Sequence, residues 1–424
     1  MDMKKTFMGI AAVLAAGVVQ AEIMDRQPGF KIGERLTLRP RVSFSYTWDS
    51  NATQEKHGDS VSSLIVNPAL GAEYIGDTWR LTASAWYRYH WFDHYVRQLN
   101  ESSYGEDLSW AWANAPANEK GWSLMLSEKF HAISQDDDMS QYSGRGKMRD
   151  RREFDIAGVV QRRFNENLHG SVDASYYYLD YDNNHDKYAQ LYGWSRLVLG
   201  AEAGYAISQW TDVLLAANWQ RYDQKNYKNN YAWYANENVM RESSRRYADN
   251  SDGLSVMVGL GSYATDRISY RAMVGWSRFN YADGYYTADG WTYNVSGKWQ
   301  ISETWNTMLL ATSYYQPSER DFGSAVRVDS ISWGLAHQMI KGKLKAVLDL
   351  AYRHETHEYT TYDADDYDEN IFTGRIGLDY IINRFLAVFG QVEYQKLDTE
   401  RNRGYYYDWE YDRFRATVGF RLTY

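Results

Sequence analysis

Alternation of apolar and polar residues, repeated in segments of about ten residues, is the feature that most constrains this chain. In the final segment, "FRATVGFRLTY", an apolar or aromatic side chain falls at every second position. Successive side chains of a β-strand point to opposite faces of its sheet, so the segment predicts a strand with one apolar and one polar face. Two segments near the start of the chain, "LTLRPRVSFSYTW" and "WRLTASAWYRYHW", show the same alternation.

The alternating segments are joined by short and long connections in turn. Short polar stretches such as "FNEN" (164–167), "ISET" (301–304) and "INRF" (382–385) recur between long strands. The result is a hairpin repeat of roughly 40 residues, and about 18 strands in total. A propeller has a similar repeat length but uses four short strands in each blade, so it fits less well. The pattern predicts an all-β chain that forms a transmembrane antiparallel up-and-down β-barrel.

Composition supports a membrane barrel over a soluble protein. Aromatic residues make up 16% of the chain, 38 of them tyrosines, although the mean hydropathy is −0.63. Tyrosine and tryptophan favour a membrane–water boundary because each has an apolar body and a polar tip. Cysteine is absent, which excludes disulfides and thiolate metal sites.

Three regions follow from this interpretation. Residues 1–21 have two lysines, an apolar stretch and a small-residue ending, which predict a cleaved secretory signal peptide. The alternative, a membrane anchor, requires a longer apolar stretch. Residues 22–35 are expected to form a short periplasmic segment and residues 36–424 the barrel. We therefore expect location in the outer membrane of a Gram-negative cell envelope.

The first third of the barrel resembles the "putative β-barrel porin type 2" family. The resemblance rests on Leu38-Arg39-Pro40 followed by "YTWDSN", on "SSLIVNPALGAEY" with a Gly-Asp turn, and on a strand ending "WYRYHWF". Arg39 stands where the family more commonly has threonine. Beyond about residue 95 only the barrel pattern matches. The resemblance implies an outer-membrane barrel that works in solute passage or in exopolysaccharide export.

The alternate positions of the strands would line the lumen. The pore-lining candidates are Arg39, Arg41, Arg80, Arg88, Arg375, Arg413, Arg415 and Arg421. Closure of the barrel pairs the last strand with the first, which brings Arg413, Arg415 and Arg421 onto the same wall as Arg39 and Arg41, with Arg80 and Arg88 two strands away. A basic wall would attract anionic solutes or acidic polysaccharide. The alternative is that lumen acids such as Glu73 pair with these arginines and stiffen the wall without selecting any solute.

The C-terminal strand also resembles the signal that the barrel-assembly machinery reads. The positions that carry this expectation are Phe414, Val418, Phe420, Leu422 and Tyr424, although a terminal phenylalanine is more common than Tyr424. Expected partners are thus the assembly machinery, outer-membrane lipid and lipopolysaccharide, and small solutes or glycan. A homo-oligomer is left open, and no nucleic-acid partner is expected.

The long connections 49–60, 131–150, 222–250, 354–369 and 396–408 are expected to be extracellular loops. Asp136–Asp138 and 363–369 are acidic, and Ca²⁺ is one interpretation of them, but neither has EF-hand spacing and a solvated loop fits better. Loop tyrosines and tryptophans would stack on sugars or, more simply, form an interfacial belt.

Signals for chemistry are weak. We predict no cofactor or metal site, because the pairs His90 with His94 and His354 with His357 lie at strand–loop junctions and not on a helix. No G-x-S-x-G nucleophile elbow occurs, so no enzymatic activity is predicted. The leading function is diffusion of small hydrophilic solutes through an aqueous lumen. The alternatives are a conduit for exopolysaccharide export and a non-conducting structural or adhesion barrel.

Overall fold

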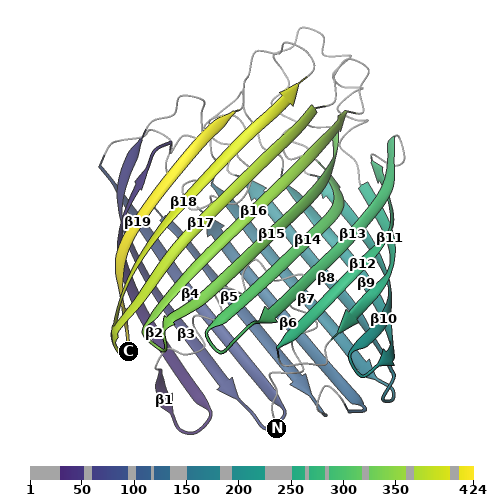
Figure 1. The fold of residues 1–424 in the computed structure, drawn as a ribbon, viewed down its shortest axis with the longest axis horizontal. Helices are drawn as coiled ribbons and strands as arrows, with labels where there is room; N and C mark the ends of the chain where they lie inside the picture. The colour runs from purple at the N-terminus through teal and green to yellow at the C-terminus, as the bar shows by residue number, and fades with distance from the viewer. Residues whose placement is uncertain are drawn as a thin grey trace.

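The computed structural model is one antiparallel β-sheet that closes on itself as a barrel of tilted strands (Figure 1). It describes residues 29–51, 60–93, 102–115, 119–133, 150–181, 193–224, 251–262, 267–281, 286–317, 324–359, 367–401 and 410–424. The expected signal peptide, residues 1–21, lies outside these ranges. The described residues include no helix that is long and apolar enough to cross a membrane.

Nineteen strands occur in the described residues, and eighteen of them form the wall. Their bounds are β1 (Phe30–Ile32), β2 (Leu36–Asp49), β3 (Val61–Ile75), β4 (Trp79–Phe92), β5 (Ser102–Ala113), β6 (Gly121–Ile133), β7 (Arg151–Arg163), β8 (Leu168–Tyr181), β9 (Trp194–Ser208), β10 (Thr211–Gln224), β11 (Ser251–Ser262), β12 (Ile268–Tyr281), β13 (Tyr286–Gln300), β14 (Trp305–Pro317), β15 (Ser324–Ile340), β16 (Leu344–Tyr359), β17 (Tyr367–Asn383), β18 (Leu386–Arg401) and β19 (Tyr411–Thr423).

Each strand from β2 to β19 pairs with its neighbours in sequence, and β19 pairs with β2 to close the wall. At this closure Phe420 lies opposite Phe44 and their rings stack with centroids 5.1 Å apart. The short strand β1 pairs with the first residues of β2 through a turn in which Gly33 has a φ of 68°. The predicted all-β barrel of about 18 strands is therefore confirmed.

The outer surface of the wall is apolar. On β11, for example, the exposed positions are Leu254, Val256, Val258 and Leu260, whereas the intervening Gly253, Ser255, Met257, Gly259 and Gly261 point inward. A soluble protein would not leave such a surface in water, but a barrel in lipid requires it. The alternation seen in the sequence thus separates a lipid-facing surface from the lumen.

Aromatic side chains border this apolar band. One row, which we call the outer aromatic row, crosses five neighbouring strands at one level: Tyr352, Phe372, Tyr394, Phe414 and Trp48. On β17 the next exposed aromatic residue toward the opposite end is Tyr380. From Phe372 to Tyr380 the strand covers roughly 26 Å, or roughly 20 Å along the membrane normal at a tilt of about 40°. This height suits the apolar band of an outer-membrane barrel.

The two ends of the barrel differ. At the turn end, short turns connect strands, as at 164–167, 301–304 and 384–385, and the C-terminus lies there (Figure 1). At the other end, called the loop end, the connections fall largely outside the described residues. The short turns predicted at 164–167, 301–304 and 382–385 therefore occur where the sequence pattern placed them.

Several strands continue past their predicted ends at the loop end. β16 extends to Tyr359, β17 begins at Tyr367, and β18 extends to Arg401. The expected loops 354–369 and 396–408 therefore contain strand at their margins. These margins are rich in charged residues, so hydrophobic alternation does not mark them, yet the antiparallel ladder continues there because backbone hydrogen bonds do not depend on side-chain polarity.

One sector of the wall, β10 to β14, is packed on its inner side. Leu214, Ala216, Met257 and Met273 form a buried cluster on β10, β11 and β12. Nearer the loop end, Tyr222 of β10 donates its hydroxyl to the backbone oxygen of Tyr315 on β14 at 3.5 Å. These strands are four apart in the wall, so the sheet curls sharply here and side chains fill the curve. Apolar side chains therefore fill part of the inner side of β10–β12.

Two inward glycines permit this curl. A Cβ on Gly259 would meet the backbone oxygen of Ala272, and it would lie 2.7 Å from the Cα of Met273 on β12. A Cβ on Gly275 would meet the backbone oxygen of Val256 on β11. The two strands approach each other more closely than any residue with a side chain allows.

Gly259→Ala is therefore expected to lower the free energy of unfolding by about 1–3 kcal/mol, because backbone must move to admit the methyl group. Urea unfolding of the refolded barrel in lipid vesicles measures the effect. Gly377→Ala is the matched control, since a Cβ there would have its nearest neighbours at an ordinary 3.9 Å. Equal stabilities of the two variants would contradict this account of the curl.

Candidate pore-lining site at the barrel closure

All eight arginines named from the sequence lie at inward positions of one sector of the wall, which we call the closure sector. It runs from β17 through the β19–β2 closure to β4. Arg375 is on β17, Arg413, Arg415 and Arg421 are on β19, and the other four are on β2 and β4. The predicted pairing of the last strand with the first is what brings them together.

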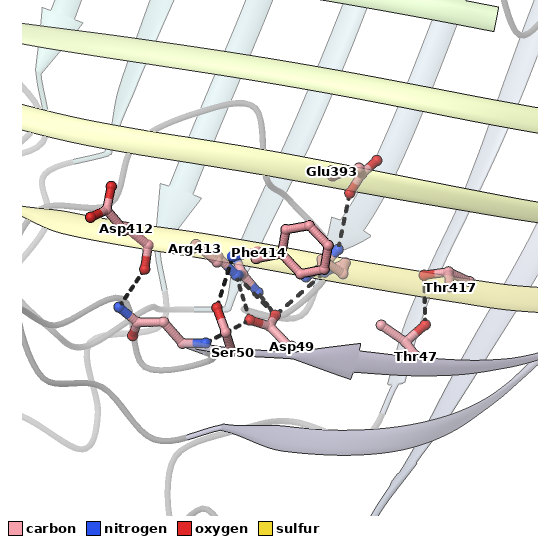
Figure 2. A network of polar contacts seen from close by, with 10 residues as sticks. Thr47, Asp49, Ser50, Glu393, Asp412, Arg413, Phe414 and Thr417 are labelled. Atoms are coloured by element: carbon pink, nitrogen blue, oxygen red, sulfur yellow. Dashed lines mark hydrogen bonds and ion pairs between the residues drawn. The ribbon is translucent and has the colours of Figure 1, made fainter.

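Asp49 organises the loop end of the closure sector (Figure 2). Its carboxylate accepts hydrogen bonds from Nε of Arg413 at 2.9 and 3.1 Å, and Arg415 lies 3.4 Å away. The Arg413 side chain is 0% exposed and that of Asp49 only 5%. Arg415 also reaches Glu393 on β18 at 4.0 Å. This buried network joins three strands across the closure.

Backbone contacts hold the same region in register. The amide of Ser50 donates to the backbone oxygen of Phe414 at 2.9 Å, and the amide of Phe414 donates to the Ser50 hydroxyl at 2.8 Å. Farther along the closure, the hydroxyls of Thr47 and Thr417 lie 2.9 Å apart (Figure 2). Because its side chain is fully buried in this closely paired region, Arg413 is part of the structure of the wall and is not exposed to the lumen.

Nearer the turn end, Glu73 on β3 lies between two arginines. Arg39 on β2 donates to it at 2.6 Å, and Arg80 on β4 lies 2.5 Å from its other oxygen. The carboxylate of Glu73 is 7% exposed, whereas Arg39 and Arg80 are 24% and 29% exposed. The guanidinium groups consequently present positive charge to the lumen while the acid stays behind them.

Arg375 and Arg421 also pair with carboxylates on nearby strands. Arg375 donates to Asp349 on β16 from Nε at 2.9 Å. Arg421 pairs with Asp379 on β17, which lies two strands away across β18. Arg41 lies at an inward position of β2, in the same sector as Arg88 and Arg421. The closure sector therefore holds both signs of charge. Pairing of arginines with acids across strands is what the alternative interpretation of the sequence described.

The assembly-signal residues have a separate place. Phe414, Val418, Phe420, Leu422 and Tyr424 all point to the outer surface, and each is at least 38% exposed. The ring of Tyr424 stacks on that of Phe385 with centroids 6.0 Å apart. The strand therefore presents an apolar ladder to the outside and arginines to the lumen.

Sequence reasoning missed Asp49, because the loop was expected to begin there. Asp49 follows Trp48 directly and lies two residues after Thr47, which points inward. This alternation could have indicated that the strand continues to Asp49 and that its side chain points inward. Glu355, His357 and Glu369 were likewise assigned to a loop, and all three are buried. The acidic residues Asp136–Asp138 and Asp363–Asp366, and the loop aromatics, lie outside the described residues.

The comparisons with known proteins agree with this architecture. Residues 236–424 match the model of the family described as "Putative beta-barrel porin 2". The match covers the C-terminal part of the chain, whereas the motifs that first suggested this family lie before residue 95. The resemblance to the porin 2 family is therefore confirmed. The chain is a porin-like outer-membrane β-barrel.

Solved outer-membrane proteins resemble the chain distantly. The loop L8 deletion mutant of OmpT from Vibrio cholerae is 11% identical, with 92% of this chain and 100% of that chain covered and a TM-score of 0.37. The siderophore receptor PirA from Acinetobacter baumannii is 9% identical, with 93% and 81% covered and a TM-score of 0.42. FrpB of Neisseria meningitidis, in its apoprotein form, is 10% identical, with 87% and 62% covered and a TM-score of 0.45. No curated protein matches the chain. Likeness at this level identifies no solute.

Proposed function

We propose that this barrel lets small hydrophilic solutes diffuse across the outer membrane along the closure sector. The observation that carries the proposal is the contrast between the two sectors of the wall. An apolar cluster packs on the inner side of β10–β12, whereas the closure sector carries partly exposed arginines beside the buried carboxylate of Glu73. Polar side chains that face the lumen favour water and dissolved ions along that side.

The charge arrangement supports a weak preference for anions. Arg39 and Arg80 are more exposed than Glu73, and Arg41 and Arg421 lie at inward positions of the two paired strands of the closure. The charge exposed beside Glu73 is therefore more positive than the formal pairing suggests. Because each acid still cancels part of the charge, selection would be modest and based on charge sign, with no stereospecific site.

The direct test is single-channel recording of the purified protein in planar bilayers. We expect steps of current above those of protein-free membranes, and a reversal potential in a salt gradient that indicates modest anion preference. Glu73→Gln should shift the reversal potential toward greater anion preference, and Arg80→Gln should shift it in the opposite direction. Lys341→Gln, at an exposed turn, is the control and should leave the potential unchanged.

Absence of conductance steps would contradict the proposal and favour a non-conducting structural barrel. If the protein conducts but Glu73→Gln and Arg80→Gln do not shift the reversal potential in opposite directions, the protein is a channel whose ion selectivity does not depend on the closure sector. The first outcome concerns the lumen as a whole, and the second concerns only these side chains.

A further inference from the structure

Three buried ionisable side chains meet at the loop end of β16 and β17. Glu355 and His357 are on β16, and Glu369 is on β17 directly opposite Glu355. All three point inward, and none is more than 3% exposed. His357 lies five residues beyond Tyr352 of the outer aromatic row, or roughly 13 Å farther along the membrane normal. The group therefore lies beyond the apolar band.

The spacing of these groups suits a metal ion. Nε2 of His357 is 3.3 Å from a carboxylate oxygen of Glu355 and 3.6 Å from one of Glu369. One ligand atom from each residue can be chosen so that all three lie within 4.8 Å of one another. Two ligands bound about 2.1 Å from a tetrahedral Zn²⁺ are about 3.4 Å apart. The observed separations bracket that value.

His357 gives the second, independent observation. Its side chain is 2% exposed, and although Nε2 lies within ion-pair distance of both carboxylates, neither ring nitrogen makes a well-aligned hydrogen bond within the described residues. Buried polar atoms in proteins almost always make well-aligned hydrogen bonds, and an ion bound between Nε2 and the two carboxylates would satisfy all three side chains.

The surroundings hold the ring and one carboxylate in place. The ring of Tyr367 stacks on that of His357 with centroids 4.2 Å apart and planes 10° apart. Arg353, on the same inward face of β16, pairs with Glu355 and restrains its carboxylate. Metal ligands are commonly oriented in this way by a surrounding shell of contacts.

We propose that Glu355, His357 and Glu369 form a site for a first-row divalent transition-metal ion such as Zn²⁺. One imidazole nitrogen with two carboxylate oxygens suits Zn²⁺ better than Ca²⁺, which prefers six to eight oxygen ligands. Three protein ligands leave one position for water. The bound ion joins β16 to β17 outside the apolar band, whether or not the lumen conducts.

A protonated imidazole held between the two carboxylates would also satisfy this group, and binding experiments distinguish the two. The full mature chain, without a histidine tag, is refolded in detergent and titrated calorimetrically with Zn²⁺ near neutral pH. We expect about one Zn²⁺ per chain. His357→Ala and Glu369→Gln should each weaken binding by at least about tenfold.

His169→Ala is the matched control. His169 also faces a lumen carboxylate, that of Asp212 at 3.0 Å, but belongs to no group of three candidate ligands among the described residues. It should bind Zn²⁺ as the wild type does. Because every variant keeps the acidic connections, non-specific uptake by them would be equal in all.

Equal Zn²⁺ uptake by the wild type and His357→Ala would overturn the proposal. If the variants do not fold, as judged by circular dichroism, Co²⁺ decides the question on the wild type alone. An intense visible absorption band of bound Co²⁺, displaced by Zn²⁺, supports a tetrahedral site. Absence of that band overturns it and leaves the protonated histidine as the bridge.

Discussion

Asp49→Ala is expected to lower the free energy of unfolding by about 3–5 kcal/mol, the usual cost of removing one partner from a buried ion pair. The substitution removes the carboxylate that accepts hydrogen bonds from Arg413 and lies next to Arg415. Arg413 would then stay fully buried without this partner. It also weakens the one interface that no hairpin supports, because β19 and β2 come from opposite ends of the chain. Equilibrium unfolding of the vesicle-embedded barrel by guanidinium chloride measures the change.

Asp77→Ala serves as the control for this experiment. Asp77 also pairs with an arginine, Arg35 at 3.0 Å, but its side chain is 83% exposed at the turn end. Exposed ion pairs contribute little to stability, so this variant should unfold as the wild type does. A wild-type stability for Asp49→Ala would mean that the network in Figure 2 is dispensable for closure.

Ile376→Arg is expected to destabilise the barrel in lipid by about 2–4 kcal/mol. Ile376 is exposed on the outer surface of β17, midway between Phe372 and Tyr380, so an arginine there would be placed near the centre of the apolar band. The same unfolding measurement in vesicles records the loss.

Ile382→Arg supplies the depth control, because Ile382 is also exposed on β17 but lies at the turn end, past Tyr380. A charge near the interface should cost only about 0–1 kcal/mol. If both variants lost the same stability, the apolar band would not be centred between the aromatic residues of β17.

The hairpin repeat was readable from sequence because each membrane strand must present apolar side chains to lipid at every second position. "FRATVGFRLTY" shows this directly, and its alternate side chains Phe414, Val418, Phe420, Leu422 and Tyr424 do point outward. The same rule fails where a strand leaves the membrane. Glu355, His357 and Glu369 lie on strands, but neither face of those ends needs to be apolar, so the pattern there resembles a loop.

Partners across the wall could be inferred only in part. Seven of the arginines were placed on one wall because closure of the barrel requires the first and last strands to meet, whereas Arg375 was expected only to line the pore. The choice of partner depends on register, and the register of β19 against β2 places Asp49 directly opposite Arg415 and beside Arg413. A shift of one residue would turn those side chains to the other face.

The sequence by itself determined an antiparallel barrel of about 18 strands, its lipid-facing surface and the sector in which its arginines gather. Those properties follow from a local rule, the two-residue period of a strand in lipid. Only the tertiary structure decided the curl of β10–β14, the burial of Arg413 behind Asp49, and the meeting of His357 with Glu369. These depend on strand register and on contacts between side chains of different strands, for which the chain carries no periodic signal; in the case of Asp49 and Arg413 the strands come from opposite ends of the chain.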